Sequence, residues 1–121
     1  MPVAGDWTGT GTTKIGIFRS GYLWMLDANG NGITDGDDSF FAFGGGPGDI
    51  PLVGAWTGYG VSKVGLFRNG FLWTLDANHT KVIDSGDEVF AYAGLRGDVP
   101  IVGDWKGTGR TNPRIFRAGY F

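Results

Sequence analysis

The stretch that decides the fold is residues 2–23, "PVAGDWTGTGTTKIGIFRSGYL", because the chain repeats it twice more. Residues 51–72 read "PLVGAWTGYGVSKVGLFRNGFL", and residues 100–121 read "PIVGDWKGTGRTNPRIFRAGYF". Each residue type that the three copies share recurs after 49 residues, as the tryptophans show: Trp7, Trp56 and Trp105.

Each complete copy contains four short apolar runs separated by turn residues. In the first copy they read "PVAGDW", "KIGIFR", "YLWMLD" and "SFFAFG". The third run places Tyr22, Trp24 and Leu26 on one face. Leu23 and Met25 fall on the other face, and this period of two is typical of a strand. Short connections such as "RSG" favour hairpins, and the glycines disfavour helices.

Four antiparallel strands in a repeat of this length are typical of a β-propeller blade. The sequence therefore predicts an all-β fold, with one propeller fragment over residues 1–121. The first two copies agree at about half of their positions, and the third stops early. We divide the fragment into blade 2–50, blade 51–99 and a partial blade, 100–121. Since one sheet cannot bury two apolar faces alone, the blades must stack.

The segments "GDWTGTGTTKIGIF" (residues 5–18) and "GDWKGTGRTNPRIF" (residues 103–116) carry a family resemblance. They resemble the FG-GAP/VCBS-type repeats of bacterial surface proteins and integrin-like propellers, whose pattern is Gly-Asp-aromatic-Asn-Gly-Asp-Gly before an apolar strand. The similarity extends over essentially the whole chain. It implies a propeller used for binding or display, often with calcium, in an extracellular or cell-surface location.

In that family the loop after the first strand holds calcium, but here this loop departs from the pattern. Thr8 and Thr10 stand where acid or amide ligands are expected, and Lys14 replaces the closing acid. An ammonium group at a ligand position repels Ca²⁺. We therefore expect that this loop has lost its metal and that Lys14 lies beside Asp6 as a built-in cation. The second copy has lost the acid as well, and its corresponding residues are Ala55 and Lys63.

The loop after the third strand, "DANGNGITDGDD" (residues 27–38), has the ligand spacing of an EF-hand-type calcium loop. Oxygen-bearing side chains fall at positions 1, 3, 5, 9 and 12, a glycine at position 6, and a carbonyl is offered at position 7. The alternative is a plain turn, since Asn-Gly pairs favour hairpins. A hairpin does not need twelve residues or the later acids, so we favour calcium. The predicted ligands are Asp27, Asn29, Asn31, Ile33 (carbonyl), Asp35 and Asp38.

The second copy of this loop, residues 76–87, keeps the acids but differs at two positions. Thr80 replaces the position 5 amide, and Lys81 replaces the turn glycine. Both changes should lower the affinity for Ca²⁺, and they leave the occupancy of this loop open. The corresponding ligands are Asp76, Asn78, Thr80, Val82 (carbonyl), Asp84 and Asp87. In an up-and-down sheet, both long loops of each copy emerge at the same edge.

Composition and charge disfavour several functions. The net charge is −2 with scattered basic residues, which argues against nucleic acid as a partner. Cysteine is absent, and no apolar run has the length of a membrane span. No signal peptide is expected, and Met1 directly precedes the first copy, which suggests an excised or engineered chain. His79 is the only histidine, and almost all acids fall in repeated loops, so we expect no enzyme.

The tryptophans and the repeated arginines have structural and functional interpretations. Trp24 and Trp73 lie within alternating strands and are expected in the core. The tryptophans at the ends of the first strands could pack, or could form a carbohydrate site between blades. These candidate ligand-binding residues are Trp7, Trp56 and Trp105. The arginines that precede a turn glycine should pair with carboxylates, and they are Arg19, Arg68 and Arg117.

Two and a half blades cannot close a ring of four to eight, so we predict a homo-oligomer. Two chains supply about five blade equivalents and three chains about seven and a half, which points to a dimer or trimer. The preferred function is a calcium-stabilised, self-assembling structural propeller module. The alternatives are a lectin-like propeller and a protein–protein adhesion module.

Overall fold

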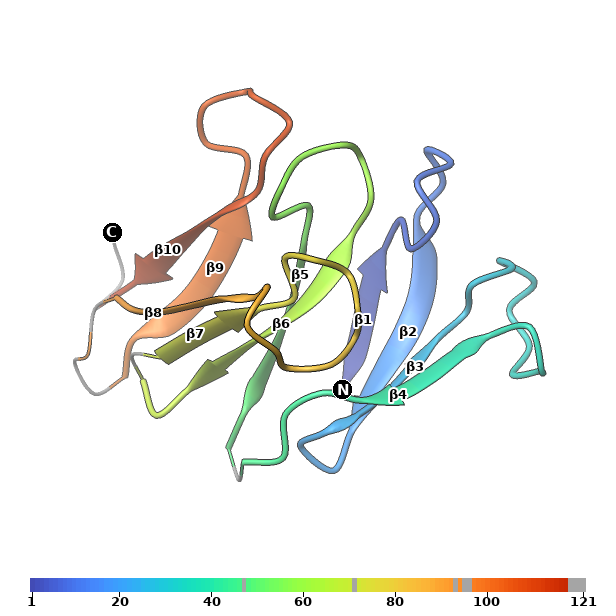
Figure 1. The fold of residues 1–121 in the computed structure, drawn as a ribbon, viewed down its shortest axis with the longest axis horizontal. Coiled ribbons are helices and arrows are strands. Elements are labelled where there is room, and N and C mark those ends of the chain that lie inside the picture. Colours follow the sequence, from blue (N-terminus) through green and yellow to red (C-terminus); the bar gives the residue numbers. More distant parts are fainter. Residues whose placement is uncertain (47, 71, 93, 95–96, 118–121) are drawn as a thin grey trace.

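The computed structural model describes residues 1–46, 48–70, 72–92, 94 and 97–117. Within these ranges the chain forms ten strands and no helix, arranged as three antiparallel sheets (Figure 1). The sheets follow one another in the order of the sequence. The all-β expectation and the four-stranded antiparallel sheets are confirmed.

The strand order within each sheet is the order of the sequence. The first sheet contains β1 (Pro2–Gly5), β2 (Lys14–Arg19), β3 (Leu23–Leu26) and β4 (Ser39–Ala42). The second contains β5 (Ile50–Gly54), β6 (Lys63–Arg68), β7 (Leu72–Leu75) and β8 (Glu88–Ala91). The third contains β9 (Val99–Gly103) and β10 (Asn112–Phe116), and residues 118–121 of the partial third copy lie outside the described part.

The two long loops of a sheet emerge at the same edge, as the antiparallel order requires. In the first sheet, Gly5 of β1 pairs with Lys14 of β2, and Leu26 of β3 pairs with Ser39 of β4. The loops are neighbours in space as well, because a Cβ added at Gly30 would lie 3.3 Å from Lys14 Cε. Events in one loop can therefore influence the other.

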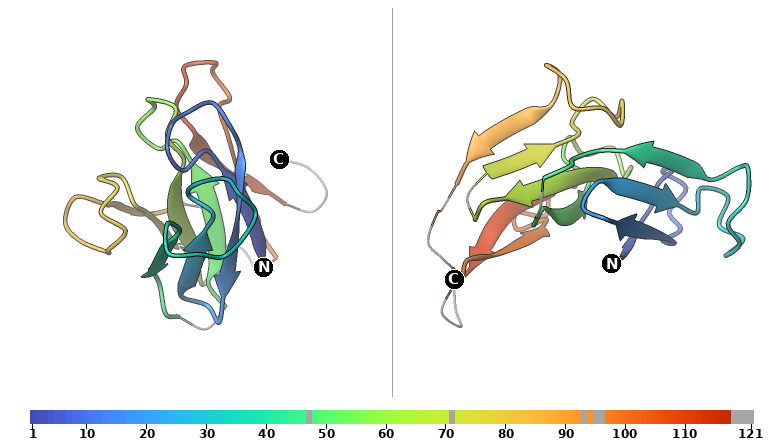
Figure 2. Two further views of the ribbon diagram at one scale, coloured as in Figure 1. Left: turned by 90° about the vertical axis from the view of Figure 1, so that its right-hand side faces the viewer. Right: turned by 90° about the horizontal axis from the view of Figure 1, so that it is seen from below.

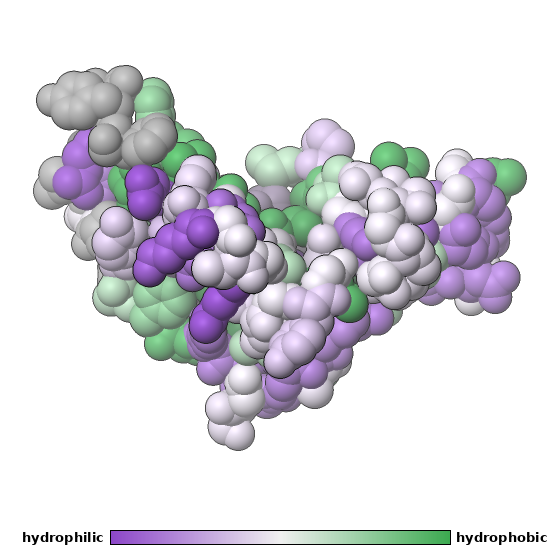
Figure 3. Space-filling view, turned by 90° about the horizontal axis from the view of Figure 1, so that it is seen from above, coloured by the Kyte–Doolittle hydropathy of each residue, from purple (hydrophilic) through white to green (hydrophobic). Residues whose placement is uncertain are grey.

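The three sheets stand side by side like a fan. The first strands lie closest together, and β5 contacts β1 on one side and β9 on the other. The later strands splay apart, and the outline seen from above is V-shaped (Figures 2 and 3). Hydrophobic residues gather on the flank where β8 and the third sheet lie (Figure 3).

Two faces must be distinguished on each sheet. We call the face toward the preceding sheet the N-side face and the face toward the following sheet the C-side face. Two apolar clusters fill the spaces between successive sheets, each combining one C-side face with the next N-side face. The first cluster contains Trp7, Phe18, Trp24, Leu26, Phe43, Val64 and Leu66. The second contains Leu52, Trp56, Phe67, Trp73, Leu75 and Ile115.

Trp24 and Trp73 are completely buried, which confirms the expectation that they belong to the core. The Trp24 ring lies 4.8 Å from Phe18 and stacks on Phe41 at 6.2 Å, centroid to centroid. Trp73 repeats this arrangement in the second sheet. Such aromatic pairs add to the stabilisation that burial of their area provides.

Hydrogen bonds join successive sheets at one repeated position, which we call the clamp. The Ser62 hydroxyl accepts from the Asp6 N–H at 2.9 Å, and the Ser62 N–H donates to the Asp6 carbonyl at 2.9 Å. Thr111 holds Ala55 in the same way, at 3.0 and 2.9 Å. The approach is close, because a Cβ added at Gly5 would lie 2.8 Å from Ser62 Cβ. Glycine is therefore required there.

Candidate functional site: the loops at one edge of the sheets

The loop between β1 and β2 is organised around the Lys14 ammonium. Lys14 Nζ donates to Thr8 Oγ1 at 2.8 Å and to Thr10 Oγ1 at 3.2 Å. It also lies 3.7 Å from Asp6 Oδ1. The Asp6 carboxylate in turn accepts the N–H groups of Thr10 at 3.1 Å and Gly11 at 2.7 Å. Lys14 therefore lies beside Asp6 as a built-in cation, as expected from its position in the sequence.

The Asp6 carboxylate is held in its charged form. Burial by itself would raise the pKa of Asp6, but the N–H groups of Gly11, Thr10 and Gly9 lower it. The charge of Lys14 lowers this pKa further, and the net pKa lies below its ordinary value. The Lys14 ammonium therefore supplies the positive charge at the centre of this loop.

The second and third copies use the same loop differently. Lys63 Nζ donates to Thr57 Oγ1 at 2.6 Å and to the carbonyl of Ala77, at 2.9 Å, in the loop between β7 and β8. In the third copy Asp104 again accepts two N–H groups, from Thr108 and Gly109. In the second sheet, Lys63 thus links the two neighbouring loops.

Asp27 shapes the first half of the loop between β3 and β4. Its carboxylate accepts the Gly30 N–H at 3.1 Å and the Gly32 N–H at 2.8 Å. Both glycines have a φ of 74°, a left-handed conformation that glycine adopts without strain. Asp27 therefore holds the turn through hydrogen bonds of its own, in addition to any role as a ligand.

The two predicted amide ligands of this loop converge on Asp35. Asp35 accepts the side-chain amides of Asn31 at 2.6 Å and Asn29 at 3.3 Å. The hydrogen bond from Asn31 is the main reason why the pKa of Asp35 lies below its ordinary value. A rotation of each amide about its last side-chain bond would present oxygen instead of nitrogen. The alternate residues of the loop thus face one centre.

Position 12 of this loop carries an oxygen without a hydrogen bond. Asp38 Oδ2 accepts the Asp35 N–H at 3.0 Å, while Asp38 Oδ1 is buried and has no hydrogen-bond partner among the described residues. Buried polar atoms are normally satisfied, so an orphaned carboxylate oxygen indicates a missing partner. A cation at the centre of the loop would supply it.

The second copy of the loop repeats this pattern around Asp76. Asp76 is completely buried and accepts the N–H groups of Thr80 at 3.1 Å and Lys81 at 3.0 Å. Asp84 accepts the amide of Asn78 at 2.7 Å and the Thr80 hydroxyl at 2.8 Å. Thr80 thus takes up the contact that Asn31 makes in the first copy.

Asp87 at position 12 again has a buried Oδ1 without a partner among the described residues. Burial raises the pKa of both Asp76 and Asp87, and the charge of Asp76 raises that of Asp87 further. The N–H groups of Lys81 and Thr80 oppose the rise at Asp76. Two neighbouring carboxylates disfavour each other's charged form.

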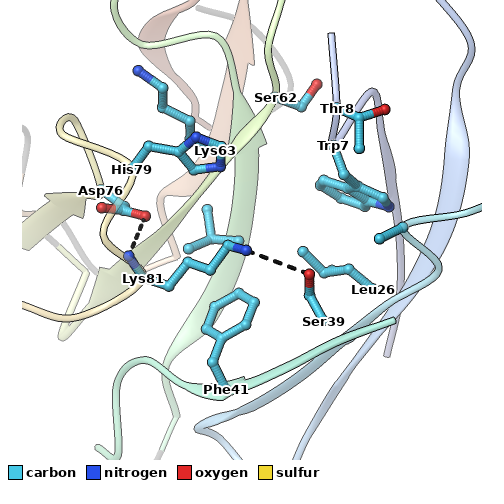
Figure 4. A pocket seen from close by; sticks show the side chains of 12 residues that line it. Trp7, Thr8, Leu26, Ser39, Phe41, Ser62, Lys63, Asp76, His79 and Lys81 are labelled. Atoms are coloured by element: carbon cyan, nitrogen blue, oxygen red, sulfur yellow. Dashed lines mark hydrogen bonds between the residues drawn. The ribbon is translucent and has the colours of Figure 1, made fainter. Parts of the chain in front are cut away.

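Lys81 does not put its charge into this loop. It takes the left-handed conformation of the glycine it replaces, with a φ of 64°. Its Nζ turns toward the first sheet, donates to Ser39 Oγ at 3.3 Å and lies 5.6 Å from the centroid of the Phe41 ring (Figure 4). The expected repulsion of Ca²⁺ by Lys81 is therefore weaker than its sequence position suggests.

The acids of these loops remain separated. Within the described ranges, no group of three or more His, Asp or Glu side chains is close enough to hold a metal ion by itself. Each loop would need its amide, hydroxyl and carbonyl oxygens as well, as calcium loops do. The structure brings the predicted ligands of each loop into one turn, and calcium in them stays a prediction.

A cavity of about 80 Å³ lies between the first two sheets, beside these loops (Figure 4). Lys81 crosses it from the second sheet to Ser39 of the first. Asp76, which is buried, and His79, which is exposed, line its other side. Burial and the charges of Lys81 and Lys63 lower the pKa of His79.

The three rim tryptophans differ in exposure. The exposed fraction is 6% for Trp7, 0% for Trp56 and 40% for Trp105. Each indole N–H donates to a carbonyl in the second strand of its own sheet, and the acceptors are Ile15, Val64 and Asn112. The carbohydrate hypothesis stays a prediction, and Trp105 is the accessible ring.

Two repeated features were not found from the sequence. One is the clamp, whose signal is a hydroxyl residue at the same place in each copy. The other is the partner of the arginines: Arg68 and Arg117 bind Asp49 and Asp98 in the preceding linkers, both in a bidentate way. The signal is an aspartate that precedes each arginine by the same interval. The hydroxyl residues at this place are Thr13, Ser62 and Thr111, and the last two form the clamp.

No protein-family model matches the chain, and no curated protein or solved structure does so either. The described residues also contain no apolar helix with the length needed to span a bilayer.

Proposed function

We propose that the chain is a structural β-propeller module of the FG-GAP/VCBS type that associates with copies of itself. Repeated four-stranded antiparallel sheets, with their first strands innermost, support this proposal. In a propeller, blades pack face to face around an axis lined by the first strands. The module is non-catalytic and belongs to a cell-surface or extracellular protein, as the resemblance of its repeats implies.

The observation that carries the proposal is a difference between equivalent residues. Val64 and Leu66 on the N-side face of β6 are 2% and 1% exposed, because the first sheet covers them. Their counterparts Ile15 and Ile17 on β2 are 62% and 40% exposed. The same apolar face is buried in the second copy and exposed in the first, and an exposed apolar face of this kind marks a protein–protein interface.

Calcium is the proposed stabiliser of the loops between β3 and β4 and between β7 and β8. In the first loop the carboxylates of Asp27, Asp35 and Asp38, the amide oxygens of Asn29 and Asn31, and the Ile33 carbonyl would hold the ion. A bound Ca²⁺ would neutralise the acids and tie the turn together, which is a structural role. The orphaned Oδ1 atoms at position 12 support this fit.

Asp38→Asn should abolish stabilisation by Ca²⁺ at the first loop and leave the melting temperature in EDTA nearly unchanged. Asparagine keeps an oxygen for the Asp35 N–H, but it loses the charge and places an NH₂ group at the ligand position. Thermal melting with Ca²⁺ and with EDTA measures the effect. Asp27 suits this test less, since its carboxylate also holds Gly30 and Gly32.

The matched control is Asp37→Asn, which removes an exposed acid next to the ligand set. This variant should keep the full response to Ca²⁺. If Asp38→Asn and wild type respond equally to Ca²⁺, the first loop is not a calcium site.

In the second loop, Asp87→Asn should raise the melting temperature in EDTA while it lowers the response to Ca²⁺. Without a cation the buried Asp76 and the orphaned Asp87 oppose each other's charge, so removing one charge relieves the fold. With Ca²⁺ the same change removes a ligand. If the variant melts at a lower temperature than wild type in EDTA, charge repulsion between Asp76 and Asp87 does not destabilise the fold.

Self-association is tested by the mass of the 121-residue chain in solution. We expect a mass of at least twice 12.9 kDa at micromolar concentration, with or without chelator. A particle of 12.9 kDa across the whole accessible concentration range would contradict the proposal.

A lectin-like function is the second candidate, because the cavity in Figure 4 lies between two sheets as such a site requires. Its polar lining includes Ser39, Lys81 and Asp76. Titration with simple sugars, followed by tryptophan fluorescence, decides this: saturable changes that need no Ca²⁺ favour a lectin. No change up to millimolar sugar rejects it.

A further inference from the structure

The third sheet ends on the same clamp position by which the first two sheets hold their successors. The peptide groups of Asp6 and Ala55 are each bound by a hydroxyl residue of the next sheet. Asp104 is their counterpart in the third sheet, and its N–H has no acceptor among the described residues. Thr13 is the counterpart of the clamping residues, and its hydroxyl has no partner in the described part of the chain either.

The apolar surfaces around these two positions are complementary in kind. The N-side face of the first sheet exposes Ile15 and Ile17, which together with Met25 and Phe40 line a shallow groove of about 60 Å³. The C-side face of the third sheet exposes Trp105, whose counterparts are buried beneath the next sheet in both earlier copies. One face therefore lacks a predecessor, and the other lacks a successor.

We propose that the N-side face of one copy docks on the C-side face of a second copy and continues the stack. The Thr13 hydroxyl accepts the Asp104 N–H of the second copy, and the Thr13 N–H donates to its Asp104 carbonyl. Ile15 and Ile17 cover Trp105, as Val64 and Leu66 cover Trp7 within the chain. This inference rests on the proposed self-association and adds its geometry.

The contact joins two different faces, so it is a heterologous, head-to-tail contact. A symmetric contact would join like faces and leave the clamp positions unmatched. One feature of the C-side face is not repeated: Arg114 stands where the earlier copies have Gly16 and Gly65, and its guanidinium lies 4.9 Å from the Trp105 ring. The Arg114 guanidinium packs over the Trp105 ring at the edge of the proposed interface.

The test uses one charged variant on each face. Ile15→Asp blocks the N-side face and Trp105→Asp blocks the C-side face, and a charge placed in a desolvated apolar contact should weaken association about 100-fold or more. Each variant alone should therefore sediment at the chain mass of 12.9 kDa, whereas wild type sediments higher. Mixing the two variants should restore a one-to-one dimer, because each contributes the face that the other has lost.

Ile17→Asp and Phe116→Asp serve as a second pair on the same two faces, in case a variant of the first pair does not fold. Tyr59→Asp is the control, because Tyr59 is a 91% exposed aromatic in the loop between β5 and β6. The control should associate like wild type, and thermal melting verifies that all variants are folded.

The outcomes distinguish a failure of the head-to-tail contact from a failure of self-association itself. If wild type associates but the C-side variant alone still forms dimers, or if the mixed variants remain at chain mass, the head-to-tail contact is wrong and self-association stands. If wild type itself stays at 12.9 kDa, both the head-to-tail contact and self-association are overturned.

Discussion

Replacing Trp56 by alanine should lower the free energy of unfolding by about 3–5 kcal/mol. The ring is completely buried between the second and third sheets, where it packs with Leu52 and Ile115. Its N–H also donates to the Val64 carbonyl at 2.9 Å, and truncation removes this hydrogen bond while the carbonyl keeps the Asp76 N–H at 3.0 Å. Urea denaturation followed by circular dichroism measures the change.

Trp105→Ala is the matched control, since it removes the same residue type at the equivalent position. Trp105 also donates its N–H, to the Asn112 carbonyl at 3.1 Å, but the ring is partly exposed. At concentrations too low for association, we expect a cost of about 1–2 kcal/mol, which is smaller than that for Trp56. Equal costs would show that the stacking of sheets does not bury Trp56.

Asp49→Asn should cost about 2–3 kcal/mol at neutral pH, because it breaks a bidentate ion pair with one buried partner. The Asp49 side chain is fully buried and accepts Arg68 Nε and an Arg68 terminal nitrogen, both at 2.7 Å. The Asp49 carboxylate also accepts the Gly46 N–H at 3.0 Å. The pair ties the linker after the first sheet to β6.

The matched control is Glu88→Gln, which breaks the ion pair of Glu88 with Arg110 at 3.0 Å. Both partners of that pair are more than one-third exposed, so solvent screens it and the cost should not exceed about 0.5 kcal/mol. Comparable losses for both variants would mean that burial adds nothing to the Asp49 pair.

The Asp49 pair also predicts a pH dependence. Burial by itself would raise the pKa of Asp49, but the hydrogen bonds and charge of Arg68 lower it below the ordinary value of 3.8. The pair is thus fully stabilising above pH 3.8, and this stabilisation is lost as the pH falls through the lower folded-state pKa. The difference between wild type and Asp49→Asn should shrink in that acid range. A difference that stays constant down to pH 2 would contradict this account.

Much of the fold could be predicted because the same pattern of strands and turns recurs in each copy of the repeat. The alternation in "YLWML" and the glycine-rich connections recur at the same interval, so each strand and turn is supported by its copy. The calcium interpretation of the loop beginning at Asp27 depends on a ligand spacing that is a local property of twelve consecutive residues, and it stays a prediction. The position of Lys14 beside Asp6 follows from the same locality.

Other features depend on neighbours that the local sequence does not name. Lys81 looked like a charge inside a calcium loop, but its Nζ reaches Ser39 of the preceding sheet. The sequence predicted that Arg68 pairs with a carboxylate but did not name Asp49, which is its buried partner. Both contacts join residues that are distant along the chain and close only after the sheets stack.

The sequence by itself determined the strands and their order within a sheet, because backbone geometry and alternation act over a few residues. Only the tertiary structure decided which apolar faces are covered. Ile15 and Val64 are equivalent, both β-branched and both on a second strand, and they differ only in whether another sheet precedes them. Burial is a property of the surroundings of a residue, and those surroundings exist only in the folded stack.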